Sequence, residues 1–230
     1  MDSIDVHGST CVRTLSIFKG LDDEEIAFLE RVTLPGYIHK GKIIFLEGDI
    51  AKVLYIVERG LIKLSKLTKE GKEQIIRLVF PGDIFGHSVL LQNGHYYASA
   101  EALQDSIICT IKQQDFEEVM GISPKLSARL IIMLYERLHN ADEWIYSLSL
   151  LEVEQRLARV ILLFHEKFQI QNGRFTLPVP QKELAPLIGT TPETLSRKFK
   201  GLGSKKIIQM KDHNDIRILN YIKLKELAGL

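Results

Sequence analysis

The stretch QKELAPLIGTTPETLSRKF, residues 181–199, has the spacing of two short helices joined by a tight turn. Gly189 in its middle can supply the left-handed backbone of such a turn, and the small Ala185 lets the two helices approach closely. Thr191 is a good N-cap and Pro192 suits the first helical position, so a second helix is expected to begin there. The apolar side chains that can pack between the two helices are Leu184, Ile188, Leu195 and Phe199. The stretch therefore predicts a helix-turn-helix.

The second of these helices presents a polar face. An arginine can donate two hydrogen bonds to guanine and a glutamate can accept one from cytosine, whereas hydroxyls and lysines suit phosphates. We therefore expect base contacts from Glu193, Ser196 and Arg197. Glu193 could instead serve only the helix start, and Arg197 only an ion pair with that glutamate one turn away. The expected DNA-backbone contacts are Thr191, Thr194, Lys200, Lys205 and Lys206.

The flanking segments complete a winged version of this motif. Residues 153–168 have apolar positions with helical spacing, and a short strand is expected at 174–179. Two further β runs, 206–210 and 216–219, flank a turn-rich tip at 211–215. Two helices followed by a hairpin describe a winged helix-turn-helix.

The charge of the chain is unevenly distributed. The whole sequence has 30 Lys+Arg and 29 Asp+Glu, a formal net charge of +1. Residues 1–148 have 16 basic and 21 acidic side chains, a charge of −5, whereas residues 149–230 have 14 and 8, a charge of +6. Charge alone also allows a solvated basic face, but the asymmetry favours an acidic part joined to a basic part that meets an anionic surface. Six C-terminal cations lie close together: Arg197, Lys198, Lys200, Lys205, Lys206 and Lys211.

The N-terminal part reads as short β runs separated by turns that contain glycine. The runs are 42–46, 53–57, 61–67, 73–78 and 106–111. The turns between them include Gly48-Asp49, Glu58-Arg59-Gly60, Glu70-Gly71 and Pro81-Gly82-Asp83. Strands at this spacing indicate an antiparallel barrel or sandwich.

A long helix is expected after Gly121, with Ser123 as its N-cap and Pro124 at its first position. Its apolar residues step by three and four, the a/d pattern of a helix that pairs with a second copy. This seam comprises Ile131, Leu134, Leu138, Ala141, Ile145 and Leu148. A second apolar set on an adjacent face can cover the barrel: Leu126, Leu130, Met133 and Trp144. The pattern favours a parallel homodimer, the alternative being that the seam belongs to the core of one chain.

Composition is typical of a globular protein outside membranes. The chain is 45% hydrophobic and 26% charged, and it has no apolar run near the ~18 residues that a membrane span needs. Its first ten residues lack the apolar region of a secretory signal. The two cysteines, Cys11 and Cys109, are too few for a disulfide framework, so we expect a reducing, cytoplasmic compartment and no membrane partner.

Several motifs follow one another in an order that resembles the CRP/FNR superfamily of bacterial transcription regulators. The motifs are FKGLDDEE at 18–25, Lys40-Gly41, Glu47-Gly48-Asp49, Pro81-Gly82-Asp83, the long helix, and ETLSR at 193–197. The Glu-x-x-Ser-Arg form is similar to the FNR-like branch, whereas CRP has a glycine at the serine position.

The resemblance implies an α+β fold with three parts. These are an antiparallel, cyclic-nucleotide-binding-like β-roll sensor with an N-terminal helix at 1–121, a dimerisation helix at 122–150, and a winged helix-turn-helix at 151–230. It implies a homodimer that binds double-stranded DNA at a TTGAT-N4-ATCAA palindrome. An effector in the roll would reposition the dimer helices, and so allow operator binding and contact with RNA polymerase.

By the same resemblance, the effector pocket is expected at Gly86, His87, Tyr97, Ala98 and Ser99. The Gly-Glu pair of the superfamily's cyclic-nucleotide pocket becomes Gly86-His87, and its Arg-Ser-Ala segment falls in 96–99, where no cation is available. A cyclic phosphate needs a charge-assisted partner, so cyclic AMP is disfavoured as the signal.

The identity of the effector stays open among a redox signal, a gas bound by haem, and a small organic ligand. An FNR-type iron–sulfur cluster needs four thiolates, which two cysteines cannot supply. Cys11 and Cys109 resemble FNR ligand positions and could form a redox-active pair, although Cys109 also suits a buried apolar role. Haem would use His87 as a candidate ligand, with His7 or Cys11 opposite, although a lone histidine is more often structural. No metal site is assured.

The alternative from another class is a cupin-like metal or nucleotide-binding enzyme with a basic accessory domain. Its metal site would need clustered ligands, but His39, His87 and His95 are widely spaced in the sequence. No P-loop, HExxH or nucleophile motif is present. We therefore expect a regulator rather than an enzyme.

Overall fold

The chain forms two units, Met1–Leu138 and His139–Leu230. A computed structural model describes residues 12, 13, 15, 18–71, 73–91, 93–168, 170, 172–211 and 214–230. The division falls inside the long helix α4, Pro124–Leu150, so the expected boundaries at 121 and 150 stay a prediction. Within these described ranges, no helix is long and apolar enough to cross a membrane.

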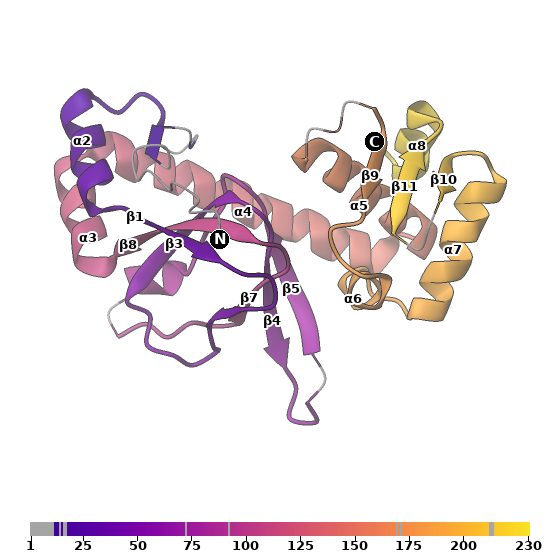
Figure 1. Cartoon of the computed structure of the whole chain (residues 1–230), viewed down its shortest axis with the longest axis horizontal. Coiled ribbons are helices and arrows are strands. Elements are labelled where there is room, and N and C mark those ends of the chain that lie inside the picture. Colours follow the sequence, from indigo (N-terminus) through magenta and orange to yellow (C-terminus); the bar gives the residue numbers. More distant parts are fainter. Residues whose placement is uncertain are drawn as a thin grey trace, which may run out of the picture. The chain divides into compact units, whose positions relative to one another are not determined.

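Two four-stranded antiparallel sheets build the first unit (Figure 1). Their strands are β1 (Leu34–Ile38), β2 (Ile43–Phe45), β3 (Val53–Arg59), β4 (Ile62–Leu67), β5 (Glu73–Val79), β6 (Ile84–Phe85), β7 (Ser99–Ala102) and β8 (Ser106–Lys112). One sheet has the strand order β1-β8-β3-β6 and the other β2-β7-β4-β5. The five expected β runs are all strands. β1, β6 and β7 were not predicted, because β1 contains Pro35 and Gly36, β6 has two residues, and β7 is rich in small residues.

The two sheets enclose one apolar core. Among its fully buried side chains are Phe18, Leu54, Ile56, Phe85 and Ile111. Gly60 turns the chain between β3 and β4 with φ +101°, and an added Cβ would lie 2.8 Å from the Cα of Ser106. Only glycine fits there, which explains why the chain turns at this residue.

Helices close one end of the roll. α2 (Asp23–Val32) begins with a capping box between Asp22 and Glu25, and its Ile26 and Leu29 are buried. α3 (Gln113–Ile122) follows β8 directly and buries Phe116 and Val119. α3 was not predicted, since the helical region was expected only after Gly121. A short 3₁₀ turn, η2 (His87–Leu90), follows β6.

Helix α4 begins as the sequence predicts. The backbone N–H of Leu126 donates to Oγ of Ser123 at 3.1 Å, and Pro124 is the first helical residue. Leu126 and Leu130 are buried in the core of the roll and Met133 packs against it, which confirms the predicted stripe for three of its four residues, whereas Trp144 belongs to the second unit. The six residues of the expected dimer seam are all exposed: Ile131, Leu134, Leu138, Ala141, Ile145 and Leu148. Within one chain they are therefore not core.

The second unit is a helix-turn-helix with a small sheet. Its helices are α5 (Val153–Lys167), α6 (Gln181–Leu187), α7 (Pro192–Ser204) and α8 (Tyr221–Ala228). Its strands are β9 (Arg174–Thr176), β10 (Ile208–Met210) and β11 (Asp215–Ile218), in the order β10-β11-β9. Both β9 and β10 are shorter than expected: β9 ends at Thr176, and β10 begins only at Ile208. Lys206, the expected first residue of β10, has a positive φ of +54°, which does not fit a strand. α8 was not predicted from the sequence. The α+β class, with an antiparallel roll and a C-terminal winged helix-turn-helix, is confirmed.

Candidate functional site

Helix α7 places the predicted base-reading side chains on one surface. The backbone N–H of Thr194 donates to Oγ1 of Thr191 at 3.3 Å and so fixes the start of the helix. Glu193 and Arg197 are exposed and Ser196 is half-buried. Residues three and four apart share one side of a helix, so the structure brings these three side chains together.

Packing under α7 holds this surface in place. The four side chains predicted to lie between the helices are buried: Leu184, Ile188, Leu195 and Phe199. Gly189 has φ +65° in the turn, and a Cβ there would lie 3.2 Å from Cδ2 of Leu148. The turn thus needs glycine both for its backbone conformation and for the close approach of α4.

The ion pair between Glu193 and Arg197, the alternative to base contact, is absent from the described residues. Nη2 of Arg197 instead donates to Oγ1 of Thr194 at 3.1 Å, one turn back on α7. Hydrogen bonds from its own backbone N–H and from the Thr191 hydroxyl lower the pKa of Glu193. The glutamate is therefore an ionised acceptor at neutral pH, which is the form that cytosine N4 requires.

One carboxylate occupies the basic face beside α7. Oε1 of Glu154 on α5 lies 2.5 Å from Nζ of Lys205, and its Oε2 lies 3.7 Å from Nζ of Lys198. These residues, with Thr194 and Arg197, line an open groove of about 450 Å³. Lys205, predicted to contact phosphates, is therefore already paired in this conformation, whereas Lys200 and Lys206 are exposed.

Arg156 on α5 links the end of α4 to the helix-turn-helix, a role that was not predicted from the sequence. This arginine is 8% exposed. Its Nη1 donates to the carbonyls of Leu148 at 3.1 Å and Leu151 at 2.8 Å, and its Nη2 donates to the carbonyl of Gly189 at 3.2 Å. A buried guanidinium with carbonyl acceptors fixes the position of each segment that it reaches. No local sequence pattern identifies its partners.

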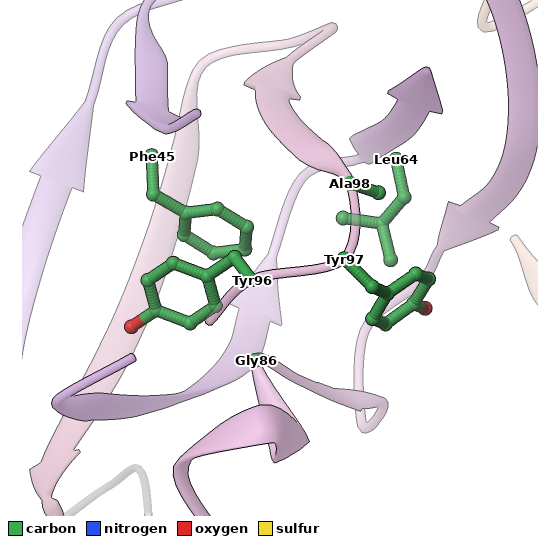
Figure 2. A pocket seen from close by; sticks show the side chains of 6 residues that line it. All are labelled: Phe45, Leu64, Gly86, Tyr96, Tyr97 and Ala98. Carbon is green, nitrogen blue, oxygen red and sulfur yellow. The ribbon is translucent and has the colours of Figure 1, made fainter. Parts of the chain in front are cut away.

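The expected effector pocket is nearly filled by aromatic side chains. Gly86, Tyr97 and Ala98 line a cavity of about 10 Å³, together with Phe45, Leu64 and Tyr96 (Figure 2). The rings of Phe45 and Tyr96 stack with centroids 3.7 Å apart, and the Tyr96 hydroxyl donates to the carbonyl of Val53 at 2.9 Å. The cavity has room for about one water molecule, so it accommodates neither a nucleotide nor a haem in this conformation.

The other two residues expected in this pocket lie outside its lining. Oγ of Ser99 accepts the backbone N–H of Glu47 at 3.0 Å and thereby links β7 to the loop after β2. His87 begins the 3₁₀ turn, and both of its ring nitrogens are buried without a hydrogen-bond partner. Burial, followed by the charges of Arg137 and Arg77, lowers the pKa of His87 to about 3. The described residues contain no group of three or more His, Cys, Asp or Glu that could hold a metal ion.

Cys109 is buried in the middle of β8 and is disulfide-bonded. It lies opposite Pro35 of β1 and Ile56 of β3. Its Sγ is 3.8 Å from Oε2 of Glu58, a contact without a thiol proton because the sulfur is in a disulfide. Cys11, the other cysteine in the sequence, lies outside the described residues. Of the two alternatives for Cys109, its burial fits the apolar role, while its disulfide shows that the sulfur is not a free thiol here.

Comparison with known proteins agrees with this architecture. Residues 36–123 match the cyclic nucleotide-binding domain, and residues 155–227 match the Crp-like helix-turn-helix domain. The cyclic AMP receptor protein of Thermus thermophilus is 30% identical over 198 residues, 84% of this chain and 88% of that relative. The fumarate and nitrate reduction regulatory protein of Vibrio cholerae is 29% identical over 231 residues, 98% of this chain and 91% of that relative. The solved structure of FixK2 from Bradyrhizobium japonicum has a TM-score of 0.77 at 26% identity, covering 85% of this chain and 97% of that chain.

A roll of this topology followed by a winged helix-turn-helix defines a DNA-binding transcription regulator with a separate sensing domain. The chain belongs to the CRP/FNR family of transcription regulators. The alternative of a cupin-like enzyme is therefore wrong, because the relatives and the matching folds are regulators.

Proposed function

We propose that the protein is a homodimeric regulator that binds double-stranded DNA at a TTGAT-N4-ATCAA palindrome. Glu193, Ser196 and Arg197 read bases, while Thr191, Thr194, Lys200, Lys205 and Lys206 contact the backbone. The observation that carries this proposal is the shared surface of the first three residues on α7, above a buried and capped helix. An ionised glutamate and an exposed arginine have the acceptor and donor groups that C·G and G·C pairs require in the major groove.

The homodimer rests on the unpartnered seam of α4. Leu138 and Ile145 are 62% and 61% exposed, although large apolar side chains at a/d spacing are normally buried. Pairing with the same helix of a second copy would bury them and set two α7 helices on one two-fold symmetric site. A cytoplasmic location and contact of the dimer with RNA polymerase belong to the same proposal.

For the signal, the disulfide at Cys109 favours redox control. Its reduction takes two electrons and two protons from a dithiol and leaves two thiols, and we propose Cys11 as the second one because the sequence has no other cysteine. The freed thiol of Cys109 would lie inside β8, next to the Glu58 carboxylate. A change at this buried position would be transmitted to β1 and β3, which pair with β8.

Fluorescence anisotropy with a labelled duplex tests the DNA site. The wild type is expected to bind the palindrome more tightly than a scrambled duplex, with affinity that falls steeply as salt rises. Arg197→Ala should lose about 1–3 kcal/mol and discriminate less at one base pair of each half-site. Lys223→Ala, an exposed cation of α8, serves as the matched control and should bind like the wild type. Equal binding of both duplexes by the wild type would contradict the proposed reading.

Redox control is tested with the same duplex. DNA affinity of the wild type is measured in oxidised protein and after reduction with dithiothreitol, and the measurement is repeated with Cys109→Ser. We expect the wild type to change its affinity between the two conditions and the variant to keep one value. An unchanged wild-type affinity would exclude redox control and leave the DNA site as proposed.

A further inference from the structure

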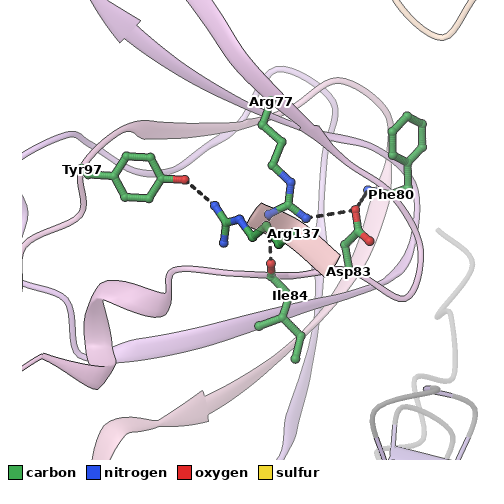
Figure 3. A network of polar contacts seen from close by, with 6 residues as sticks. All are labelled: Arg77, Phe80, Asp83, Ile84, Tyr97 and Arg137. Carbon is green, nitrogen blue, oxygen red and sulfur yellow. Dashed lines mark hydrogen bonds and ion pairs between the residues drawn. The ribbon is translucent and has the colours of Figure 1, made fainter. Parts of the chain in front are cut away.

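Two guanidinium groups meet at the edge of the roll, one from β5 and one from α4 (Figure 3). Nη2 of Arg137 on α4 donates to the hydroxyl oxygen of Tyr97 at 2.8 Å. Nη2 of Arg77 on β5 lies 3.2 Å from Oδ2 of Asp83, and its Nη1 donates to the carbonyl of Ile84 at 3.4 Å. The sequence has no cation near 96–99, and both arginines come from distant parts of the chain.

The positive charge of this cluster is only partly balanced. Within the described residues, Asp83 is the carboxylate whose charge acts on Arg137, and its Oδ2 already accepts from Arg77 and from the backbone N–H of Phe80 at 3.1 Å. Nη1 of Arg137 is buried and has no hydrogen-bond partner. Burial, then the charge of Arg77, lowers the pKa of Arg137. Leaving a buried guanidinium N–H without an acceptor costs free energy, so the site lacks one anionic acceptor.

His87 cannot supply the negative charge that the cluster lacks. Its ring nitrogens are buried and unpartnered, and burial, together with the charges of the two arginines, lowers the pKa of the imidazole so that it is neutral at physiological pH. A neutral imidazole can nevertheless donate one N–H or accept one hydrogen bond. It therefore adds an unused polar group to the same cluster without adding a further positive charge.

The cluster is open to solvent on one side. The Arg77 side chain is 25% exposed, and Tyr97 is 40% exposed. Tyr96 and Tyr97 lie on opposite sides of the small cavity that both residues line, and Tyr96 stacks on Phe45 (Figure 2). A ligand can therefore approach the cluster from solvent at Arg77 and at Tyr97, which accepts from Nη2 of Arg137, whereas Nη1 of Arg137 is buried behind them.

We propose that Arg77 and Arg137 bind the oxyanion group of a small acidic molecule, a phosphate or a carboxylate, with the Tyr97 hydroxyl as an additional donor. Guanidinium groups match both kinds of oxyanion through paired N–H donors. The bound anion would bridge β5 to α4, the helix that carries the proposed dimer seam. This inference names the chemical class of an effector for the proposed regulator, and only its regulatory consequence rests on that function.

Isothermal titration calorimetry of the full chain without DNA tests the site. Inorganic phosphate and succinate are titrated separately at constant ionic strength, with chloride as the reference anion. We expect saturable binding of at least one probe, and the probe that binds identifies the phosphate or the carboxylate class. Arg137→Gln should weaken that binding at least about tenfold, because it removes a charge-assisted donor pair. Arg137→Lys should retain part of it, since the charge stays but the planar fork is lost.

Controls separate binding from folding and from DNA recognition. Lys125→Gln removes an exposed cation from the same helix and should bind the probe like the wild type. If circular dichroism shows that Arg137→Gln is unfolded, Arg77→Gln replaces it with the same expected loss. Binding no stronger than that of chloride, or equal binding by the folded arginine variants, would overturn the proposal. Palindrome binding measured on the same wild-type sample would then show whether the DNA function stands on its own.

Discussion

Replacing His87 by glutamine should remove a loss of stability that the wild type suffers in weak acid. The imidazole is mostly buried at the start of η2, and its two nitrogens have no hydrogen-bond partner. Burial and the charges of Arg137 and Arg77 lower its pKa from 6.5 to about 3. Glutamine keeps a polar side chain of similar size and does not titrate.

The sign follows from which state takes up the proton. Above pH 6.5 the imidazole is neutral in both states and contributes no pH dependence. Below that pH the imidazole binds a proton in the unfolded chain, whereas in the folded protein it stays neutral down to about pH 3. The free energy of unfolding therefore falls as the pH falls. The unfolded imidazole is half protonated at pH 6.5, so the slope approaches about 1.36 kcal/mol per pH unit only below that pH, and the free energy of unfolding drops by about 1.6 kcal/mol between pH 6.5 and pH 5.

Urea unfolding followed by circular dichroism at a series of pH values measures this effect. The buffers contain neither phosphate nor carboxylate, because an anion bound at Arg77 and Arg137 would change the charge around the imidazole. His139→Gln, which replaces an exposed histidine of α4, is the matched control and should keep the wild-type slope. If His87→Gln lost as much stability as the wild type between pH 6.5 and pH 5, the burial argument for this histidine would be refuted.

Three further perturbations test the packing, the seam and the basic face. Leu126→Ala empties a fully buried position under α4 and should lower the free energy of unfolding by about 2–5 kcal/mol, measured by urea titration; a loss within about 0.5 kcal/mol would contradict its place in the core. Leu138→Glu places a charge in the exposed seam and should yield a folded monomer in sedimentation equilibrium, whereas a persistent dimer would exclude this seam as the contact. Glu154→Gln releases Lys198 and Lys205 and should strengthen DNA binding with a steeper salt dependence, and weaker binding at low salt would argue against phosphate contacts from these lysines.

Much of the proposed DNA surface could be predicted because its signals are local. Thr191, Pro192 and Gly189 specify a cap, a first helical residue and a turn within a few positions of one another. The spacing of Glu193, Ser196 and Arg197 then places them on one side of α7 whatever the rest of the chain does. The partner of Arg197 could not be predicted in the same way. Arg197 contacts Thr194 rather than Glu193, because several partners lie within reach of so long a side chain.

The sensing part was predicted less completely, since its features depend on contacts between distant segments. The strand runs and turns of the roll were correct, but the closed cavity results from Phe45 of β2 stacking on Tyr96, some fifty residues away. The small residues of β7 and the proline of β1 gave no alternation of apolar and polar residues. These two strands are therefore defined by pairing with neighbouring strands, and not by a pattern in their own sequence.

The sequence by itself determined the order of the parts, the helix-turn-helix, the two apolar stripes of α4 and the split between an acidic sensor and a basic C-terminal part. Each depends on periodicity, caps or charge, which act over one or two turns of chain. Only the tertiary structure decided that Arg77 and Arg137 share one site, that Arg156 holds the turn at Gly189, and that Glu154 pairs with Lys205. Those contacts exist because folding brings together side chains that have no local relation, and burial then makes each unpaired charge costly.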